Sequence, residues 1–295
     1  MTGTASTTTA RASRRRPIAG SVVLGAILVL TIVALVTLVP LLSGYDPYGQ
    51  DLMSSLAPPL NQGDERQFWL GSDALGRDVL SRLALAGRIS LGISISAVAI
   101  SLTIGLVTGT LAGFFGGLID TAVTSLADLQ LSVPRVLLLI AAAALSGPSA
   151  TTLTILIGIT GWASYCRVAR ALTLSLRSRD YVQAAVTLGT SPASSIRQHI
   201  LPNVLPHILI LATFDLGQVI VLEASMSYLG LGVQPPLPSW GGMMSEGQNY
   251  LEIAPWIALA PGFAVFLIVA GVQLVSQHLT AEGKADALAS TMLPP

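Results

Sequence analysis

The sequence predicts an all-α membrane protein with six transmembrane helices and one shaped polar loop. Of its 295 residues, 52% are apolar and only 10% are charged, with a mean hydropathy of +0.71. Soluble domains carry about 25% charged residues, so much of this chain is expected to face lipid. The net charge of zero gives no basis for binding nucleic acid. A polar segment of 23 residues, 180–202, interrupts the apolar pattern.

Six apolar stretches of suitable length predict the spans, since a membrane helix needs about 20 mostly apolar residues. The first is 17–44, a retained signal anchor after a basic tail, 1–16. The second lies in 89–119. Residues 129–172 are too long for one span, and Ser146–Ser149 is expected to divide them into spans three and four. Spans five and six are expected at about 204–229 and 254–278, with a tail at 279–295.

The distribution of basic residues predicts the orientation. Ten of the fifteen lie in the N-terminal tail, in 167–197 or in the C-terminal tail. Arg135 is expected at the cytoplasmic end of span three. The 45–88 loop carries four arginines but six acids. Both termini and the 180–202 segment are therefore expected in the cytoplasm, and the 45–88 loop outside.

A column of small residues marks one face of span two. Its members recur every four residues: Ala97, Ser101, Gly105, Gly109 and Gly113. Such columns let helix backbones approach closely in lipid, where no hydrophobic force drives helices together. The column predicts a packing face in a tight bundle. The sequence leaves open which helix or subunit it meets.

The 180–202 segment predicts two short helices joined by a turn. Asp180 is a candidate N-cap, and Gly189 can adopt the left-handed conformation that ends a helix. Ser191 and Pro192 begin a second helix, because proline suits the first helical position. Leu201-Pro202 is expected to close it. A short amphipathic helix with a sharp return suits insertion into a groove of a partner.

This segment resembles the EAA motif of ABC-importer permeases. Ala184-Ala185, Gly189, Leu201 and Pro202 fall in register with it, whereas Gln183 replaces Glu and His199 replaces Ile. FWLGSDALGRDVLSRL at 68–83, QHILPN at 198–203 and EASMSYLGLGVQPPLPSWGGM at 223–243 resemble segments of the dipeptide/oligopeptide branch. The order of segments resembles the C-type permease of that branch. The chain departs from the family at its end, HLTAEGKADALASTMLPP.

The resemblance implies the type I ABC-importer permease fold and a bacterial cytoplasmic membrane location. It implies a B-type permease partner, one fused or two separate ATPase subunits, an extracytoplasmic substrate-binding protein and a peptide substrate. It also implies contact with the ATPase through the 180–202 loop. The candidate coupling residues are Asp180, Gln183, Ala184, Ala185, Gly189, Ser191, Pro192, Leu201 and Pro202.

The chain is not expected to be an enzyme or to bind a cofactor. A P-loop needs Lys followed by Ser or Thr after a Gly-rich turn. The single lysine, Lys284, precedes Ala285 with no such turn before it. ATP and magnesium are therefore expected in partner subunits. No catalytic triad can be assembled, and the histidines lack neighbours at metal-ligand spacing, so neither a catalytic nor a metal site is predicted.

Two carboxylates inside span five are candidates for the translocation path or a gate. A charge at the bilayer centre costs about 2.5–3.5 kcal/mol on insertion scales, so Asp215 and Glu223 should face protein or water. Asp215 is expected to meet the amino terminus of a peptide, and Glu223 is equally suited to a structural role near the outer gate. Outside the membrane, Asp73, Arg77 and Asp78 are expected to form a local ion-pair cluster. The outer loop at 45–88 and Gln234–Trp240 are candidate docking surfaces for the binding protein that the resemblance implies, and Trp240 equally suits the membrane interface.

Two alternatives stay open. A permease of the same family could import another solute, such as nickel, glutathione, haem or an opine, because the binding protein largely sets specificity. A stand-alone secondary transporter or channel would need ion-coupling residues and inverted repeats, neither of which is evident. That alternative would also leave the 180–202 loop without a role.

Overall fold

A computed structural model describes residues 20–42, 46–62 and 67–291, and it is almost entirely helical. The basic tail at 1–16 lies outside the described residues. Within them the expected all-α class is confirmed, and the two strands form only a two-residue antiparallel ladder. The elements are α1 (Gly20–Leu42), a 3₁₀ turn (Leu52–Ser54), β1 (Asn61–Gln62), β2 (Gln67–Phe68), α2 (Val79–Phe115), α3 (Gly117–Ser132), α4 (Arg135–Ser146), α5 (Ala150–Arg177), α6 (Asp180–Thr187), α7 (Pro192–Ser195), a π turn (Ile196–Ile200), α8 (Leu201–Tyr228), α9 (Trp240–Gln248) and α10 (Trp256–Thr291).

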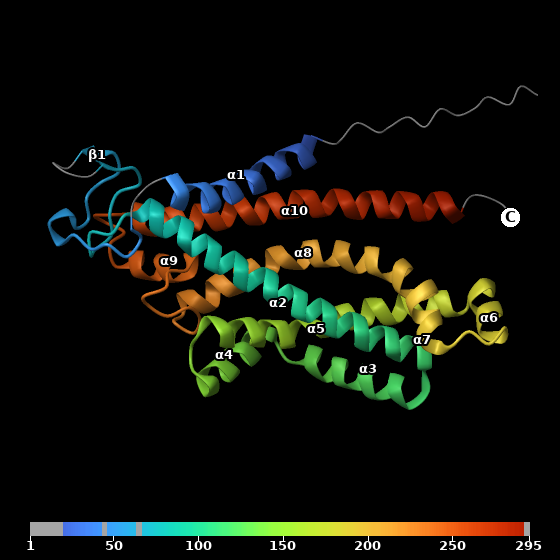
Figure 1. Cartoon of the computed structure of the whole chain (residues 1–295). Helices are drawn as coiled ribbons and strands as arrows, with labels where there is room; N and C mark the ends of the chain where they lie inside the picture. The colour runs from blue at the N-terminus through green and yellow to red at the C-terminus, as the bar shows by residue number, and fades with distance from the viewer. Residues whose placement is uncertain (1–19, 43–45, 63–66, 292–295) are drawn as a thin grey trace, which may run out of the picture.

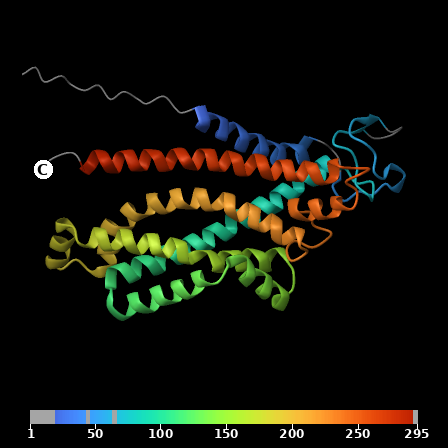
Figure 2. The same ribbon diagram turned by 180° about the vertical axis from the view of Figure 1, so that it is seen from behind.

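The long helices run between two ends of an elongated bundle (Figure 1). One end, the α9 end, carries α9 and residues 46–62 and 67–78, which we call the 46–78 segment. The other, the α6 end, carries α6, α7 and the last turns of α10. In both views α1 and α10 lie side by side, α2 crosses the bundle obliquely, and α3 to α5 cover the opposite side (Figure 2). Helix α8 lies between these two groups.

By length and composition, four helical segments within the described residues could cross a membrane: Gly20–Leu41, Val79–Phe115, Pro192–Tyr228 and Trp256–His278. The pair α3 and α4 makes a fifth if it counts as one broken span. Helix α5 has 28 residues but carries Arg167, Arg170 and Arg177 in its second half. The prediction of a sixth span therefore stays a prediction for α5.

Helix α2 begins at Val79, before the uncharged stretch that the sequence marks at 89–119. Its N-cap is Asp78, whose carboxylate accepts a hydrogen bond of 2.8 Å from the backbone N–H of Ser81. Arg88 lies inside the helix and donates 2.8 Å from Nε to the carbonyl of Val36 in α1. The helix accommodates these charges because each has a partner in the bundle.

A sharp break separates α3 from α4, which changes the expected layout of span three. The two helices meet at 88°. Pro134 has no N–H to donate and restricts the preceding residue, and Val133 is extended (φ −103°, ψ 131°). Arg135 therefore begins α4 and lies beside Ile157 of α5 and Asp215 of α8. Arg135 is thus the first residue of a helix, and its expected place at the cytoplasmic end of span three stays a prediction.

The column of small residues on α2 packs against α5. The sequence had left open which helix or subunit the column contacts. All five members are buried. A Cβ on Gly105 would lie 2.5 Å from the carbonyl oxygen of Trp162. A Cβ on Gly109 would overlap the carbonyl oxygen of Cys166 and lie 2.9 Å from Cβ of Ala169. The predicted packing face is confirmed, and its partner is a helix of the same chain.

We expect Gly109→Ala to destabilise the protein by about 1–3 kcal/mol, because overfilling a packed contact forces backbones apart. Gly92→Ala is the matched control on the same helix, since no atom lies within 4 Å of the added Cβ. It should be neutral or slightly stabilising. Unfolding in mixed detergent micelles measures both, and equal stability of the two variants would contradict the close α2–α5 approach.

Candidate coupling and translocation sites

The turn after α6 has the geometry that the sequence predicts. Gly189 adopts φ +88°, in the left-handed region. Its N–H donates 3.0 Å to the carbonyl of Val186, and the N–H of Thr190 donates 3.0 Å to the carbonyl of Ala185. These two bonds form a Schellman motif, which satisfies the free carbonyls at a helix end. The chain reverses sharply there and exposes the tip of the turn.

The two ends of the loop differ from the prediction. Asp180 is the first residue of α6 and not its N-cap, which is Arg179 without a side-chain cap. The carboxylate of Asp180 still lies in the first turn, where the helix dipole favours negative charge. At the second helix the prediction is confirmed: the Ser191 hydroxyl caps α7, with Pro192 in its first turn.

Pro202 does not close a helix. Helix α7 passes through a π turn at Ile196–Ile200 directly into α8, and Pro202 lies in the first turn of α8. Proline is tolerated there because wide π turns and first turns leave N–H groups unpaired in any case. As a result, the loop joins the span that follows it without a break.

The α6–α7 loop has one buried side and one apolar exposed side. Val182 is 1% exposed and packs into the largest core cluster of the bundle. Leu188 at the tip is 87% exposed, and Tyr181 and Val186 are about half exposed. Of the candidate coupling residues, Ala185 and Leu201 are half-buried and the others are exposed. Three exposed apolar side chains on an otherwise polar loop are consistent with a protein contact.

A polar cavity of about 210 Å³ lies at the α3–α4 break. Polar side chains of four helices line it: Gln130, Arg135, Thr160, Ser164 and Asp215. The α3–α4 break itself lies between the two ends of the bundle (Figure 1). The cavity brings Asp215 of α8 together with Arg135, the first residue of α4. No sequence signal could pair them, because 80 residues separate them along the chain.

Asp215 is held by two neighbours in this cavity. The hydroxyl of Tyr165 donates a hydrogen bond of 2.8 Å to Oδ2. Nη1 of Arg135 lies 3.9 Å from Oδ1, so the two groups form an ion pair that is too long for a hydrogen bond. The Asp215 side chain is 20% exposed and the Arg135 side chain 27%. These charges are thus compensated, as charges within a membrane must be, and both keep an open side.

Glu223 does not share this cavity. It is fully buried, and its Oε1 accepts a hydrogen bond of 2.8 Å from the Ser227 hydroxyl one turn later. Its Oε2 has no hydrogen-bond partner within the described residues. The two carboxylates of span five therefore lie in different environments. Only Asp215 has the access that a path-lining residue needs.

At the α9 end, an ion-pair cluster fastens the 46–78 segment to the helices. Asp73 pairs with Arg77 (2.6 Å) and with Arg82, and Glu246 of α9 lies 3.1 Å from Arg82. The expected Asp73–Arg77 pair is confirmed, but Asp78 is not a member because it caps α2. Arg82 and Glu246 were missed, since Glu246 is brought in only by the tertiary fold. We call these four residues the Asp73 cluster.

The charges of the Asp73 cluster control its protonation. Burial raises the pKa of the Asp73 carboxyl, but the backbone N–H of Arg77 and the charges of Arg82 and Arg77 together outweigh burial. The pKa is therefore lowered from its usual value. A folded pKa below the unfolded one stabilises the fold fully above about pH 4, and this stabilisation is lost as the pH falls through the folded pKa.

Trp240 lies in the core and not at a surface. It is 0% exposed, its Nε1 donates 3.1 Å to the carbonyl of Leu83, and its backbone N–H donates 3.3 Å to Ser90. The expectation that it anchors at the membrane interface or in a docking surface is wrong. A large ring whose N–H finds a carbonyl on α2 is more stable buried than exposed.

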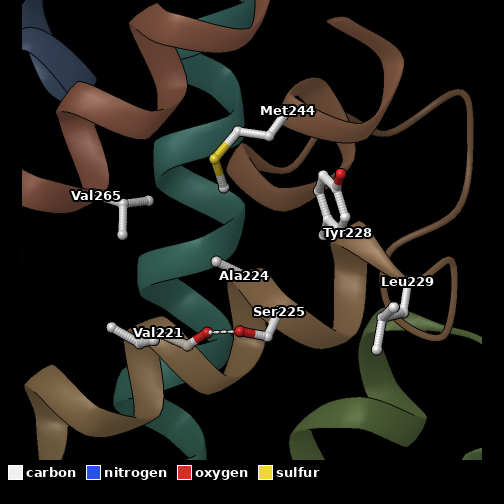
Figure 3. Close-up of a pocket in the computed structure, with 7 residues that line it drawn as sticks. All are labelled: Val221, Ala224, Ser225, Tyr228, Leu229, Met244 and Val265. Carbon is white, nitrogen blue, oxygen red and sulfur yellow. Dashed lines mark hydrogen bonds between the residues drawn. The ribbon is translucent and has the colours of Figure 1, made fainter. Parts of the chain in front are cut away.

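A further cavity of about 320 Å³ opens between α8, α9 and α10 (Figure 3). Its lining is apolar apart from Ser225 and Tyr228. The Ser225 hydroxyl donates 2.7 Å to the carbonyl of Val221 in its own helix. None of the residues that line this cavity is charged, so it could contact a ligand only through apolar and neutral polar groups. Within the part of the chain that the structure describes, no group of three or more His, Cys, Asp or Glu could hold a metal ion.

The fold and these sites define a helical membrane component of a transport system. Residues 105–281 match the family described as binding-protein-dependent transport system inner membrane component. The chain belongs to this family, and it is a multi-pass membrane protein.

Relatives with different named substrates are similarly close. The chain is 38% identical over 256 residues to a nickel transport system permease protein of Escherichia coli K12, which covers 85% of this chain and 91% of the relative. It is 36% identical over 218 residues to a dipeptide transport system permease protein of Alkalihalophilus pseudofirmus, covering 74% and 72%. It is 34% identical over 255 residues to an oligopeptide transport system permease protein of Bacillus subtilis, covering 86% and 82%.

We expect Asp73→Asn to destabilise the folded protein by about 3 kcal/mol, because it breaks a buried ion pair. This value is the lower end of the usual cost, since Glu246 remains beside Arg82 as a partner. Asp128→Asn is the control. It removes an equally close pair with Arg167 (2.6 Å), but those side chains are 63% and 55% exposed. Its cost should stay within about 1 kcal/mol. Unfolding at pH 7 compares them, and the difference should shrink as the pH falls below about 4.

Proposed function

We propose that this chain is the transmembrane subunit of an ATP-driven importer that moves di- or oligopeptides across the bacterial cytoplasmic membrane. In this proposal the termini and the α6–α7 loop face the cytoplasm, and the 46–78 segment and α9 face outward. The observation that carries it is the α6–α7 loop, a rigid two-helix projection with an exposed apolar tip. Membership of the binding-protein-dependent family supports it.

The proposed partners follow from this arrangement. One fused or two separate ATPase subunits bind the α6–α7 loop and hold ATP and magnesium. The coupling residues are Asp180, Gln183, Ala184, Ala185, Gly189, Ser191, Pro192, Leu201 and Pro202, to which the structure adds the apolar tip at Leu188. A B-type permease completes a heterodimer, and an extracytoplasmic binding protein delivers the substrate.

The loop transmits force because both its ends are fixed to the bundle. Val182 is buried in the core, and α7 is continuous with α8 through the π turn. A movement of the tip therefore moves α5 and α8 together. Binding of ATP to a partner can shift the bundle between inward- and outward-open states only if the loop contacts differ between those states.

A peptide substrate is supported by the polar cavity, which presents a cation and an anion to the same space. Nickel or glutathione, named for relatives at 38% and 35% identity, are the alternatives. Asp215 is proposed to line the translocation path. Glu223, buried against Ser227, is proposed to hold the gate region together near the α9 end.

We expect Leu188→Glu to weaken binding of the partner ATPase at least tenfold and to abolish uptake. It places a charge where an apolar side chain would be buried on binding, which is costly for an unpaired charge, and it leaves the fold intact because Leu188 is 87% exposed. Met53→Glu, at the opposite end and 96% exposed, is the control. Co-purification of the ATPase with each variant and uptake of a labelled dipeptide provide the measurements. Retention of the ATPase by Leu188→Glu would contradict coupling through this loop.

A further inference from the structure

We propose that Arg135 is the substrate-contacting residue of the translocation path and binds a carboxylate of the transported solute in the polar cavity at the α3–α4 break. This inference rests on the proposed transport function. It assigns the leading role in the cavity to the guanidinium, with Asp215 as its counter-ion when no solute is bound.

The position of Arg135 is the first reason. An arginine inside a membrane protein faces protein or water, and such residues mark substrate pathways. Arg135 donates 2.8 Å from Nη2 to the carbonyl of Ile157, about two turns from the start of α5, so its side chain is directed at the interior helix and not at a terminal loop. Its side chain lines the cavity at the α3–α4 break and is 27% accessible, so a solute in the cavity can reach it.

The hydrogen-bond inventory is the second reason. A guanidinium has five N–H groups in a planar fork that suits a carboxylate. Nη2 bonds to Ile157, and Nε lies 3.4 Å from the hydroxyl of Thr160. Nη1 lies 3.9 Å from the nearest Asp215 oxygen, beyond hydrogen-bond distance. Within the described residues, the two N–H groups on Nη1 therefore have no hydrogen-bond acceptor, and they lie beside an open cavity.

Asp215 does not depend on Arg135 alone. Its second oxygen accepts the Tyr165 hydroxyl at 2.8 Å, so the carboxylate keeps a partner when the guanidinium turns to another anion. The N-terminus of α4 adds positive potential in the same place, because its cap is Pro134, which has no side-chain hydrogen bond. Broken membrane helices commonly direct such N-termini at the anionic group of a substrate.

The size of the cavity limits what it receives. Sites for whole small molecules are about 300–1,000 Å³, and this one is about 210 Å³. It can therefore receive one end of a peptide. Gly161 provides the space, since a Cβ there would lie 2.7 Å from Nη2 of Arg135.

The test is a double-mutant cycle in the assembled importer, with uptake of labelled dialanine and co-purification of the ATPase as readouts. We expect Arg135→Gln to lower uptake at least tenfold while the ATPase is retained. Arg135→Gln combined with Asp215→Asn should stay as low. If the pair is only structural, removing both charges relieves the unpaired carboxylate and restores uptake to within threefold of the wild type, which would overturn the proposal.

A second measurement compares dialanine with its C-terminal amide. The ratio of amide to dipeptide uptake should rise at least tenfold in Arg135→Gln relative to the wild type, since only the dipeptide loses a charged contact. Delivery by the binding protein is the same for both variants and cancels in this comparison. An unchanged ratio would overturn the proposal. Arg167→Gln, which disrupts an exposed pair on α5, should leave both uptake values within twofold.

The outcomes separate this inference from the proposed function. If Leu188→Glu abolishes uptake but Arg135→Gln does not, the carboxylate site is contradicted and the proposed transport function is not. Absence of dialanine uptake by the wild-type importer contradicts both the peptide assignment and the site.

Discussion

The close approach of α2 and α5 is the constraint on which the rest of the bundle depends. It is made possible by glycines on both helices: Gly105 and Gly109 face α5, and Gly158 faces Ile100 of α2. The Ser101 hydroxyl donates 2.7 Å to the carbonyl of Gly158, a hydrogen bond that only a short distance between backbones allows. In lipid, where hydrophobic association is absent, van der Waals contact and such bonds hold helices together.

This contact also determines the chemistry of the polar cavity. With α5 fixed against α2, its next turn presents the carbonyl of Ile157 and the bare backbone of Gly161 to the α3–α4 break. Arg135 occupies that space. Further along the same helix, Tyr165 points its hydroxyl at Asp215. One helix–helix interface thus positions both partners of the central carboxylate, so packing and the site cannot be altered independently.

Features set by local backbone chemistry were predictable from the sequence, whereas features set by tertiary contacts were not. The turn at Gly189, the cap at Ser191 and the packing column on α2 depend on residue type and spacing, and the structure has them. Pro202 was misassigned because proline is compatible with both the end and the first turn of a helix. The positions of Arg135, Trp240 and Glu246 depend on distant partners, which hydropathy does not reveal.

The connectivity relates the loop to the cavity. Helix α5 leads into α6, and α7 continues into α8, so Thr160, Tyr165 and Asp215 are all carried by the two helices that the loop joins. Arg135 is on α4, on the other side of the break. Because the Arg135 guanidinium is bonded to Ile157 of α5, a displacement that moves α8 relative to α5 would change the separation of Arg135 and Asp215, now 3.9 Å. The interaction of two charges varies inversely with distance and is strengthened where water is excluded. In the proposed importer, such a displacement of the loop would therefore change how strongly Arg135 holds an anion.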